Sequence, residues 1–168
     1  KNKNPDFIFF GGMGAVAGPM LRQLKQLNMN ILFFGGDGIC TAELPRLAGD
    51  ALGSKQVFCA EAGGLLDDET KQRNLAFRQR FQEENNVEVK LYAPYVYDAT
   101  MILVEAMKKA NSTDPKIFSS QIKKVNYFGV TGPISFDKFG DVKNAALTIF
   151  SFKDGSKFPI EVVKSSGG

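Results

Sequence analysis

Phe7-Ile-Phe-Phe-Gly-Gly-Met-Gly14 and Ile31-Leu-Phe-Phe-Gly-Gly-Asp-Gly38 are two versions of one pattern, an apolar run that stops at paired glycines. Each run is typical of a buried parallel strand whose end opens into a loop. Between them, residues 19–27 place their apolar side chains on one helical face. Pro19 is expected in the first turn of this helix, where its missing N–H costs nothing. The stretch therefore predicts a βαβ unit.

The paired glycines also locate a candidate site. A right-handed crossover brings the ends of both strands to the same edge of the sheet, and open α/β sheets bind ligands outside that edge. Asp37 lies there in a loop formed by Gly35, Gly36 and Gly38. We predict that Asp37 and Gly36 contact a ligand.

The middle of the chain continues the alternation of strands and helices. Residues 56–60 predict a third strand, which ends at the glycine pair of Glu61-Ala-Gly-Gly64. Residues 92–95 are expected to form a bend before a helix. The predicted helices are residues 41–48 with Thr41 as N-cap, residues 67–85 on the surface with an acidic first turn, residues 96–111, and residues 115–125 with Asp114 as N-cap.

The pattern changes to strands and tight turns from Tyr127 onward. This segment is expected to break at Gly132-Pro133, and residues 137–141 have the composition of a turn. Residues 145–152 and 158–163 flank Asp154-Gly155, a strong hairpin signal. We therefore expect an α/β fold that closes with an antiparallel β-hairpin.

The composition excludes several functions. With 168 residues and 43% hydrophobic content, the chain can bury a core as one domain or two small ones. Its net charge is only +3 with scattered basic residues, so no nucleic acid partner is expected. No stretch reaches the length of a membrane span. The absence of histidine rules out Ser-His-Asp, Cys-His and His-metal chemistry. Together with the family resemblance given below, this leads us to expect neither an enzyme nor a bound cofactor.

Seven motifs in a fixed order carry a resemblance to a known family. They are Phe7-Ile-Phe-Phe-Gly-Gly12, Gly18-Pro-Met-Leu-Arg-Gln23, Phe34-Gly-Gly-Asp-Gly-Ile-Cys-Thr41, Leu47-Ala-Gly-Asp50, Tyr92-Ala-Pro-Tyr-Val-Tyr-Asp-Ala99, Thr131-Gly-Pro-Ile-Ser-Phe-Asp137 and Gly140-Asp141. Each motif is weak alone. In this order and spacing, they resemble the second half of a branched-chain amino acid (Leu/Ile/Val) binding protein of a bacterial ABC transporter.

The resemblance implies a fold and a function. The fold would be a partial periplasmic-binding-protein type I fold, with flavodoxin-like parallel sheets flanked by helices and a C-terminal β-hairpin. The protein would be the periplasmic solute-binding component of an ABC importer. It would hold a branched-chain or related amino acid in the cleft between two lobes and deliver it to ABC permease subunits. Any signal peptide would lie upstream of this chain.

Members of this family are about twice as long, so the resemblance implies a fragment. Residues 1–63 would be part of the second (C-terminal) lobe and residues 64–141 part of the first (N-terminal) lobe. Residues 142–168 would cross back and add the terminal hairpin to the second lobe. The missing N-terminal half would be a further partner, which supplies most of the groups that hold the ligand carboxylate.

The resemblance also assigns roles to individual residues. Asp37 would pair with the ligand's α-ammonium group, although it could instead cap the helix near Thr41. Tyr95 would present its ring to the ligand side chain, or serve as a core aromatic residue at a helix start. Met13 stands where relatives often carry an aromatic wall, and a flexible thioether shapes a pocket less sharply than a ring.

Two other functions fit parts of the sequence. Gly12-x-Gly14, followed by Ala17 and later by Asp37, imitates the fingerprint of a Rossmann NAD-binding oxidoreductase domain. The imitation is imperfect because Asp37 lies beyond two glycines instead of at the strand end. The other alternative is an amino-acid-sensing receptor domain of the same fold, which the sequence does not distinguish from a transport protein.

The two cysteines are candidates for a disulfide. Cys40 lies just past the second predicted strand and Cys59 at the end of the third, so both should sit near one edge of the sheet. An even count and a periplasmic address favour a bridge, with two buried thiols as the alternative. With no histidine in the chain, a metal site is not expected.

Overall fold

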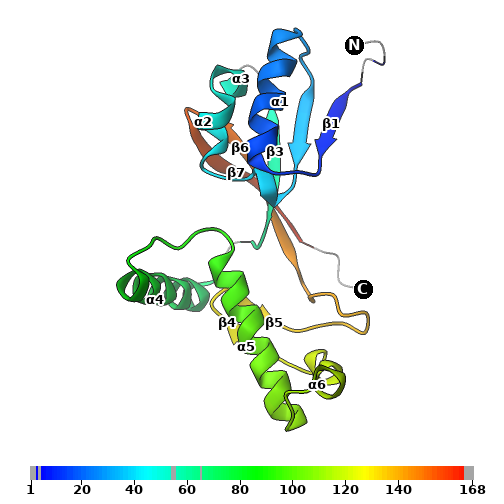
Figure 1. Ribbon diagram of the computed structural model, residues 1–168, viewed down its shortest axis with the longest axis vertical. Helices are drawn as coiled ribbons and strands as arrows, with labels where there is room; N and C mark the ends of the chain where they lie inside the picture. The colour runs from blue at the N-terminus through cyan, green and yellow to red at the C-terminus, as the bar shows by residue number, and fades with distance from the viewer. Residues whose placement is uncertain (1–2, 4, 54–55, 65, 165–168) are drawn as a thin grey trace. The chain divides into compact units, whose positions relative to one another are not determined.

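The computed structural model describes residue 3 and residues 5–53, 56–64 and 66–164. Most of the charged start and the last four residues of the predicted 142–168 segment lie outside this range. The described chain forms two compact units (Figure 1). Unit 1 consists of the residues up to 64 together with 146–164, and unit 2 consists of residues 66–145.

Unit 1 is built on a five-stranded sheet with the order β1-β2-β3-β6-β7. The first three strands are parallel, and the last two run antiparallel as a hairpin. This agrees with the α/β fold and the terminal hairpin expected from the sequence. The strands are β1 (Phe7–Phe10), β2 (Leu32–Gly35), β3 (Val57–Ala62), β6 (Ala146–Lys153) and β7 (Ser156–Lys164).

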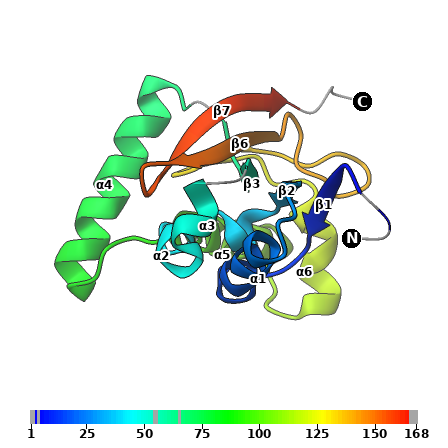
Figure 2. The same ribbon diagram turned by 90° about the horizontal axis from the view of Figure 1, so that it is seen from above.

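Three helices cover one face of this sheet, as Figure 2 shows. They are α1 (Gly14–Gln26), α2 (Leu44–Ala48) and α3 (Asp50–Gly53). Their apolar residues form the core of unit 1 together with Phe33, Val57 and Cys59 of the sheet. Leu21, Ile39 and other members of this core are completely buried. The amphipathic pattern of the sequence thus selects the face on which the helices pack.

The expected position of Pro19 is wrong, because α1 begins at Gly14 and Pro19 lies inside it. The early start is stabilised by Met13, whose carbonyl accepts hydrogen bonds from the N–H groups of both Val16 and Ala17. It is also stabilised by close packing, since a Cβ on Gly18 would lie 2.6 Å from Leu47 Cβ. Tertiary contacts of this kind override local helix signals.

Thr41 is not the N-cap that the sequence suggested. The helix α2 begins at Leu44 after Glu43, and the carbonyl of Thr41 instead closes a turn with the N–H of Leu44 (3.2 Å). Pro45 explains the difference. A helix that began directly after Thr41 would need an intrahelical hydrogen bond from the residue at Pro45, which has no N–H to donate.

The strand β3 runs two residues further than predicted. Its end is extended because Glu61 pairs with Thr148 and Ala62 pairs with Leu147 on the antiparallel strand β6. The hairpin between β6 and β7 turns at Asp154-Gly155, as the sequence predicted. Both turn residues have positive φ angles (51° and 76°), which the favoured two-residue hairpin turn requires.

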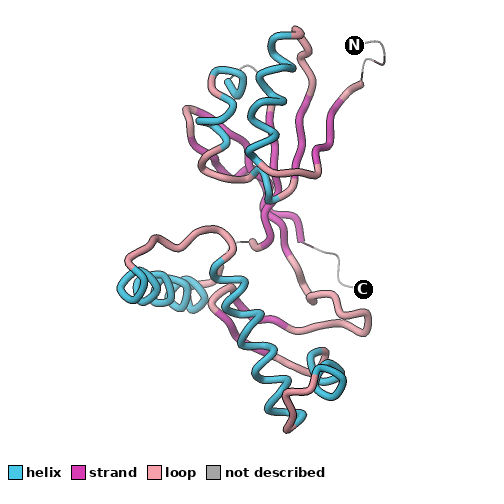
Figure 3. The backbone as a smooth tube through the Cα atoms, in the orientation of Figure 1, coloured by secondary structure: helices cyan, strands magenta, loops and turns pink. Residues whose placement is uncertain are grey.

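Unit 2 contains three helices and a two-stranded sheet (Figure 3). Its core comprises Ile102, Ala106, Phe118 and Val125. The elements are α4 (Asp68–Asn85), α5 (Ala93–Ala110), α6 (Pro115–Ile122), β4 (Tyr127–Gly129) and β5 (Gly132–Ile134).

The expected helix starts in unit 2 are partly confirmed. Asp67 caps α4 by accepting a hydrogen bond from Thr70 N (2.7 Å), and this bond lowers the pKa of its carboxyl. Asp114 caps α6 through Lys116 N (2.9 Å). The predicted bend at residues 92–95 is wrong, because α5 already begins at Ala93. Pro94 is compatible with this helix start, because it lies in the first turn, where a backbone N–H would have no partner within the helix.

The predicted break at Gly132-Pro133 is displaced by two residues. The chain turns at Val130 and Thr131, and Gly132 already pairs with Gly129 as part of β5. The Asp98 side chain holds this turn, and Asp98 is only 1% exposed. Its carboxylate accepts hydrogen bonds from Val130 N (2.9 Å), Thr131 N (2.8 Å) and Thr131 Oγ1 (2.6 Å).

Residues 137–141 form the turn expected from the sequence. One carboxylate oxygen of Asp137 accepts hydrogen bonds from the backbone N–H groups of Phe139 (2.8 Å), Gly140 (2.8 Å) and Asp141 (2.9 Å). These donors hold the pKa of Asp137 below its usual range, with the bond from Asp141 contributing most. The carboxylate of Asp137 is therefore engaged in shaping the chain.

Candidate ligand-binding site

The strands β1 and β2 end level with each other, whereas the neighbouring strand β3 continues for three more residues to Ala62. Phe10 of β1 pairs with Gly35 of β2, and Gly35 pairs in turn with Cys59 of β3. The residues that follow these positions therefore emerge at one edge of the sheet. They include the loop at residues 11–13 and the short 3₁₀ helix η1 (Asp37–Ile39).

Met13 and η1 lie close together at this edge. A Cβ placed on Gly38 would come within 2.8 Å of Met13 Sδ and 2.7 Å of the carbonyl oxygen of Gly12. Gly38 therefore allows the two loops to approach each other. Met13 itself is 58% exposed and remains accessible from solvent.

Asp37 is the first residue of η1 and is exposed. Its carboxylate forms no hydrogen bond or ion pair with another described residue. The neighbouring helix α2 begins after Glu43 and carries no side-chain cap within the described chain, so Asp37 does not cap it. A Cβ on the preceding Gly36 would meet no atom within 4 Å. The Asp37 carboxylate is therefore accessible to solvent, and the space beside the preceding Gly36 is open.

Cys40 and Cys59 form the disulfide predicted from the sequence. The two Cα atoms are 5.4 Å apart and the residues are 19 positions apart in the chain. Both cysteines are buried, at 1% and 2% exposure. The bridge links the residue directly after η1 to the strand β3, and the alternative of two buried thiols is wrong.

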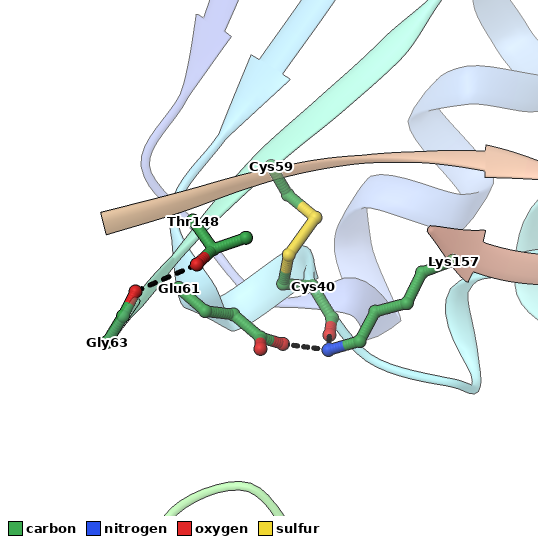
Figure 4. A network of polar contacts seen from close by, with 6 residues as sticks. All are labelled: Cys40, Cys59, Glu61, Gly63, Thr148 and Lys157. Carbon is green, nitrogen blue, oxygen red and sulfur yellow. Dashed lines mark hydrogen bonds and ion pairs between the residues drawn. A yellow bond between two sulfur atoms is a disulfide. The ribbon is translucent and has the colours of Figure 1, made fainter. Parts of the chain in front are cut away.

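An ion pair beside the disulfide was not predicted from the sequence. Lys157 of β7 contacts the Glu61 carboxylate of β3, and its Nζ donates a hydrogen bond to the carbonyl oxygen of Cys40 (3.0 Å; Figure 4). The sequence signals are a glutamate near the end of β3 and one of several charged residues in β7. The contact can be inferred only when β6 is known to lie between β3 and β7 in the sheet.

Tyr95 belongs to unit 2, where it lies in the first turn of α5 and is 37% exposed. It is therefore not a core aromatic residue of that unit. The structure brings together Met13, Gly36 and Asp37 within unit 1. The contribution of Tyr95 to the same ligand-binding site stays a prediction.

The sheet face opposite α1–α3 carries an apolar hollow of about 440 Å³. Three aromatic rings form a row across it, with Phe34 packed edge-on against Phe7 and stacked on Phe58. Phe9 is 70% exposed. Among the described residues of unit 1, no helix covers this face. The hollow is lined by Phe7, Phe9, Leu32, Phe34, Gly35, Phe58, Cys59, Ala60 and Ile149.

Other kinds of site receive no support from the described residues. No group of three or more His, Cys, Asp or Glu side chains is arranged there to hold a metal ion. None of the described helices is long and apolar enough to cross a membrane.

A sheet whose parallel strands end in glycine loops near Asp37, with a second unit inserted between β3 and β6, defines an α/β architecture in which ligands are expected at the carboxyl ends of the strands. The family follows from comparison with known proteins. The chain belongs to the periplasmic binding protein family, whose model matches residues 1–157. This match concerns nearly the whole chain, whereas the dinucleotide fingerprint concerned only a few positions near its start.

The relatives include amino acid binding proteins. The leucine-, isoleucine-, valine-, threonine- and alanine-binding protein of Pseudomonas aeruginosa is 26% identical over 162 residues, which cover 96% of this chain and 42% of that protein. The Leu/Ile/Val-binding protein homolog 1 of Brucella abortus is 30% identical over 159 residues, which cover 93% and 41%. The chain thus spans about two fifths of these curated relatives.

Solved structures agree on the fold. A leucine-binding protein from Thermotoga maritima matches with a TM-score of 0.74 and 24% identity, over 98% of this chain and 46% of that one. The branched-chain amino acid transporter substrate-binding protein from Streptococcus pneumoniae, solved with isoleucine, matches with a TM-score of 0.69 and 23% identity, over 95% and 44%. The type I periplasmic binding fold expected from the sequence is therefore confirmed for this part of the protein.

Proposed function

We propose that this chain is part of a periplasmic solute-binding protein of an ABC importer, and that the protein binds a branched-chain or related amino acid. The observation that carries the proposal is the exposed Asp37 carboxylate, which lies without a partner among the described residues at the carboxyl edge of the sheet. Family membership supports the same conclusion, because the relatives are named as binding proteins for these amino acids.

The chemistry of the edge suits an amino acid. The Asp37 carboxylate provides the charge for an α-ammonium group, and charge-assisted hydrogen bonds of this kind are stronger than neutral ones. Open space beside Gly36 and the accessible thioether of Met13 provide room for an apolar side chain. Tyr95 would present its aromatic ring to the side chain of the ligand.

The remainder of the protein would complete the site. We assign residues 1–63 to the second lobe, residues 64–141 to the first lobe, and residues 142–168 to the crossover and the terminal hairpin. The segment that is absent from this chain would supply the donors for the ligand carboxylate and cover the apolar face of unit 1. Permease subunits of the transporter would then receive the amino acid.

Replacing Asp37 with asparagine in the complete protein should weaken the binding of leucine or valine by at least about tenfold, or ~1.4 kcal/mol. The substitution keeps the size of the side chain and removes the charge that pairs with the ammonium group. Isothermal titration calorimetry measures the effect. The matched control is Asp154→Asn, which removes the same charge from unit 1 and tolerates the positive φ angle of its turn. Wild-type affinity in the Asp37 variant would show that another group binds the ammonium.

The 168-residue chain alone should self-associate and should show no micromolar affinity for leucine. Exposed apolar surface as continuous as the Phe7–Phe34–Phe58 row favours association in water. Phe9→Lys should shift the chain toward monomer in sedimentation experiments, because it places a charge on this face. Leu75→Lys, at an exposed position of α4, is the control for a general gain in solubility. A monodisperse wild-type chain with micromolar leucine affinity would contradict this prediction.

A further inference from the structure

Lys157 reaches from the hairpin to the loop that carries Asp37. Its side chain leaves β7 near the hairpin turn and passes over the ring of Phe150, with Nζ 4.6 Å from the ring centroid. The ammonium group ends between the Glu61 carboxylate and the carbonyl oxygen of Cys40 (Figure 4). Lys157 and Glu61 are both largely shielded, with 28% and 11% of their side chains exposed.

A shielded ion pair of this kind contributes little net stability to the fold. Removing an ammonium and a carboxylate from water carries a large desolvation cost, and the attraction between them often does no more than offset that cost. Apolar residues of similar size could fill the same space equally well. The pair differs from apolar packing in its geometry, because Lys157 fixes one particular carbonyl group in place.

That carbonyl belongs to Cys40, the residue directly after η1. Cys40 N donates a hydrogen bond to the carbonyl oxygen of Asp37 (3.0 Å), so the two residues close one turn of the chain. The sulfur of Cys40 is bonded to Cys59 in β3, and its carbonyl is held by Lys157 in β7. One residue of this turn is therefore attached to two different strands of the sheet. The backbone of Asp37 is held in place through Cys40.

We infer that Lys157 is a positioning residue for ligand binding, which acts through Cys40 on the Asp37 carboxylate, with Glu61 as its counter-ion. This inference rests on the proposed function. The carboxylate of Asp37 has no partner of its own among the described residues. The orientation of the carboxylate is therefore set by the backbone turn. If that turn becomes more mobile, the carboxylate samples more orientations and spends less time in the one that binds the ligand.

The test uses the complete protein that contains these residues, with leucine as the probe in calorimetry. Lys157→Met retains the length and the apolar part of the side chain but removes the charge and the hydrogen bond to Cys40. We expect a loss of affinity of about tenfold. Lys157→Arg keeps a charged donor and should restore most of the affinity. Lys153→Met removes the same charge from the exposed end of β6 in the same hairpin and should leave the affinity unchanged.

A double-mutant cycle separates positioning from a general loss of structure. If Lys157 acts through Asp37, then Lys157→Met should cost little further affinity in a protein that already carries Asp37→Asn. Should the methionine variant fail to fold, Lys157→Gln is measured in the same cycle.

The measurements distinguish a failure of the proposed function from a failure of the inference about Lys157. A wild-type protein that binds no branched-chain amino acid would contradict the proposed function and this inference with it. A wild-type protein that binds, together with unchanged affinity in the Lys157 variant or with fully additive losses in the cycle, would overturn the inference alone.

Discussion

Replacing Asp98 with alanine should lower the free energy of unfolding by about 3 kcal/mol, because each buried group left without its hydrogen bond costs roughly 1–3 kcal/mol. The carboxylate is 1% exposed and accepts three hydrogen bonds from the turn at Val130 and Thr131. Alanine would leave these donors without their partner. It would also open a cavity beside Gly129, where a Cβ would lie 2.3 Å from Asp98 Oδ2.

Denaturant unfolding followed by circular dichroism measures this effect. Asp98→Asn should lie between the wild type and the alanine variant, because one side-chain oxygen remains to accept a hydrogen bond. Asp141→Ala removes an exposed carboxylate from the same unit and should change stability little. An unchanged midpoint for Asp98→Ala would show that the turn does not depend on this carboxylate.

Loss of the Cys40–Cys59 disulfide is the second large effect that we expect. The bridge closes a loop between residues 19 positions apart, and a loop of this size contributes about 3 kcal/mol through restriction of the unfolded chain. Reduction of the wild-type protein should therefore lower its unfolding midpoint. The reductant should have no effect on a Cys40→Ala/Cys59→Ala variant, which serves as the control.

The bridge can also be checked directly. Mass spectrometry after alkylation under denaturing, non-reducing conditions should find neither cysteine modified in protein isolated from the periplasm. Two alkylated cysteines in such oxidised material would contradict the bridge. That result would also weaken the periplasmic assignment, because stable disulfides belong to oxidising compartments.

The parts of the fold that depend on neighbouring residues could be predicted from the sequence. Asp154-Gly155 specifies a hairpin turn through the positive φ angles of two adjacent residues, and the structure places the turn there. Asp67 and Asp114 cap their helices through donors two or three residues away. The edge that joins Met13 and Asp37 follows from the right-handed crossover of the βαβ unit.

The start of α1 depends on tertiary contacts and could not be predicted from the sequence. A proline indicates that a helix start is near but does not fix the position of that start. Pro45 and Pro94 occupy first-turn positions, whereas Pro19 lies inside α1 because Gly18 packs against Leu47.

The ion pair between Lys157 and Glu61 was missed for a similar reason. Its two residues are far apart in the chain and meet only through the strand order of unit 1. No local pattern in the sequence encodes such a contact.

The way in which unit 2 leaves and re-enters unit 1 has a consequence for engineering. Gly63 N donates a hydrogen bond to the carbonyl oxygen of Ala146 (2.8 Å), and Ala62 pairs directly with Leu147. The whole of unit 2 therefore begins and ends at neighbouring positions on two adjacent antiparallel strands. Unit 2 could therefore be deleted and replaced by a tight turn while β3 and β6 keep their register. It could also be exchanged for another domain whose termini lie close together.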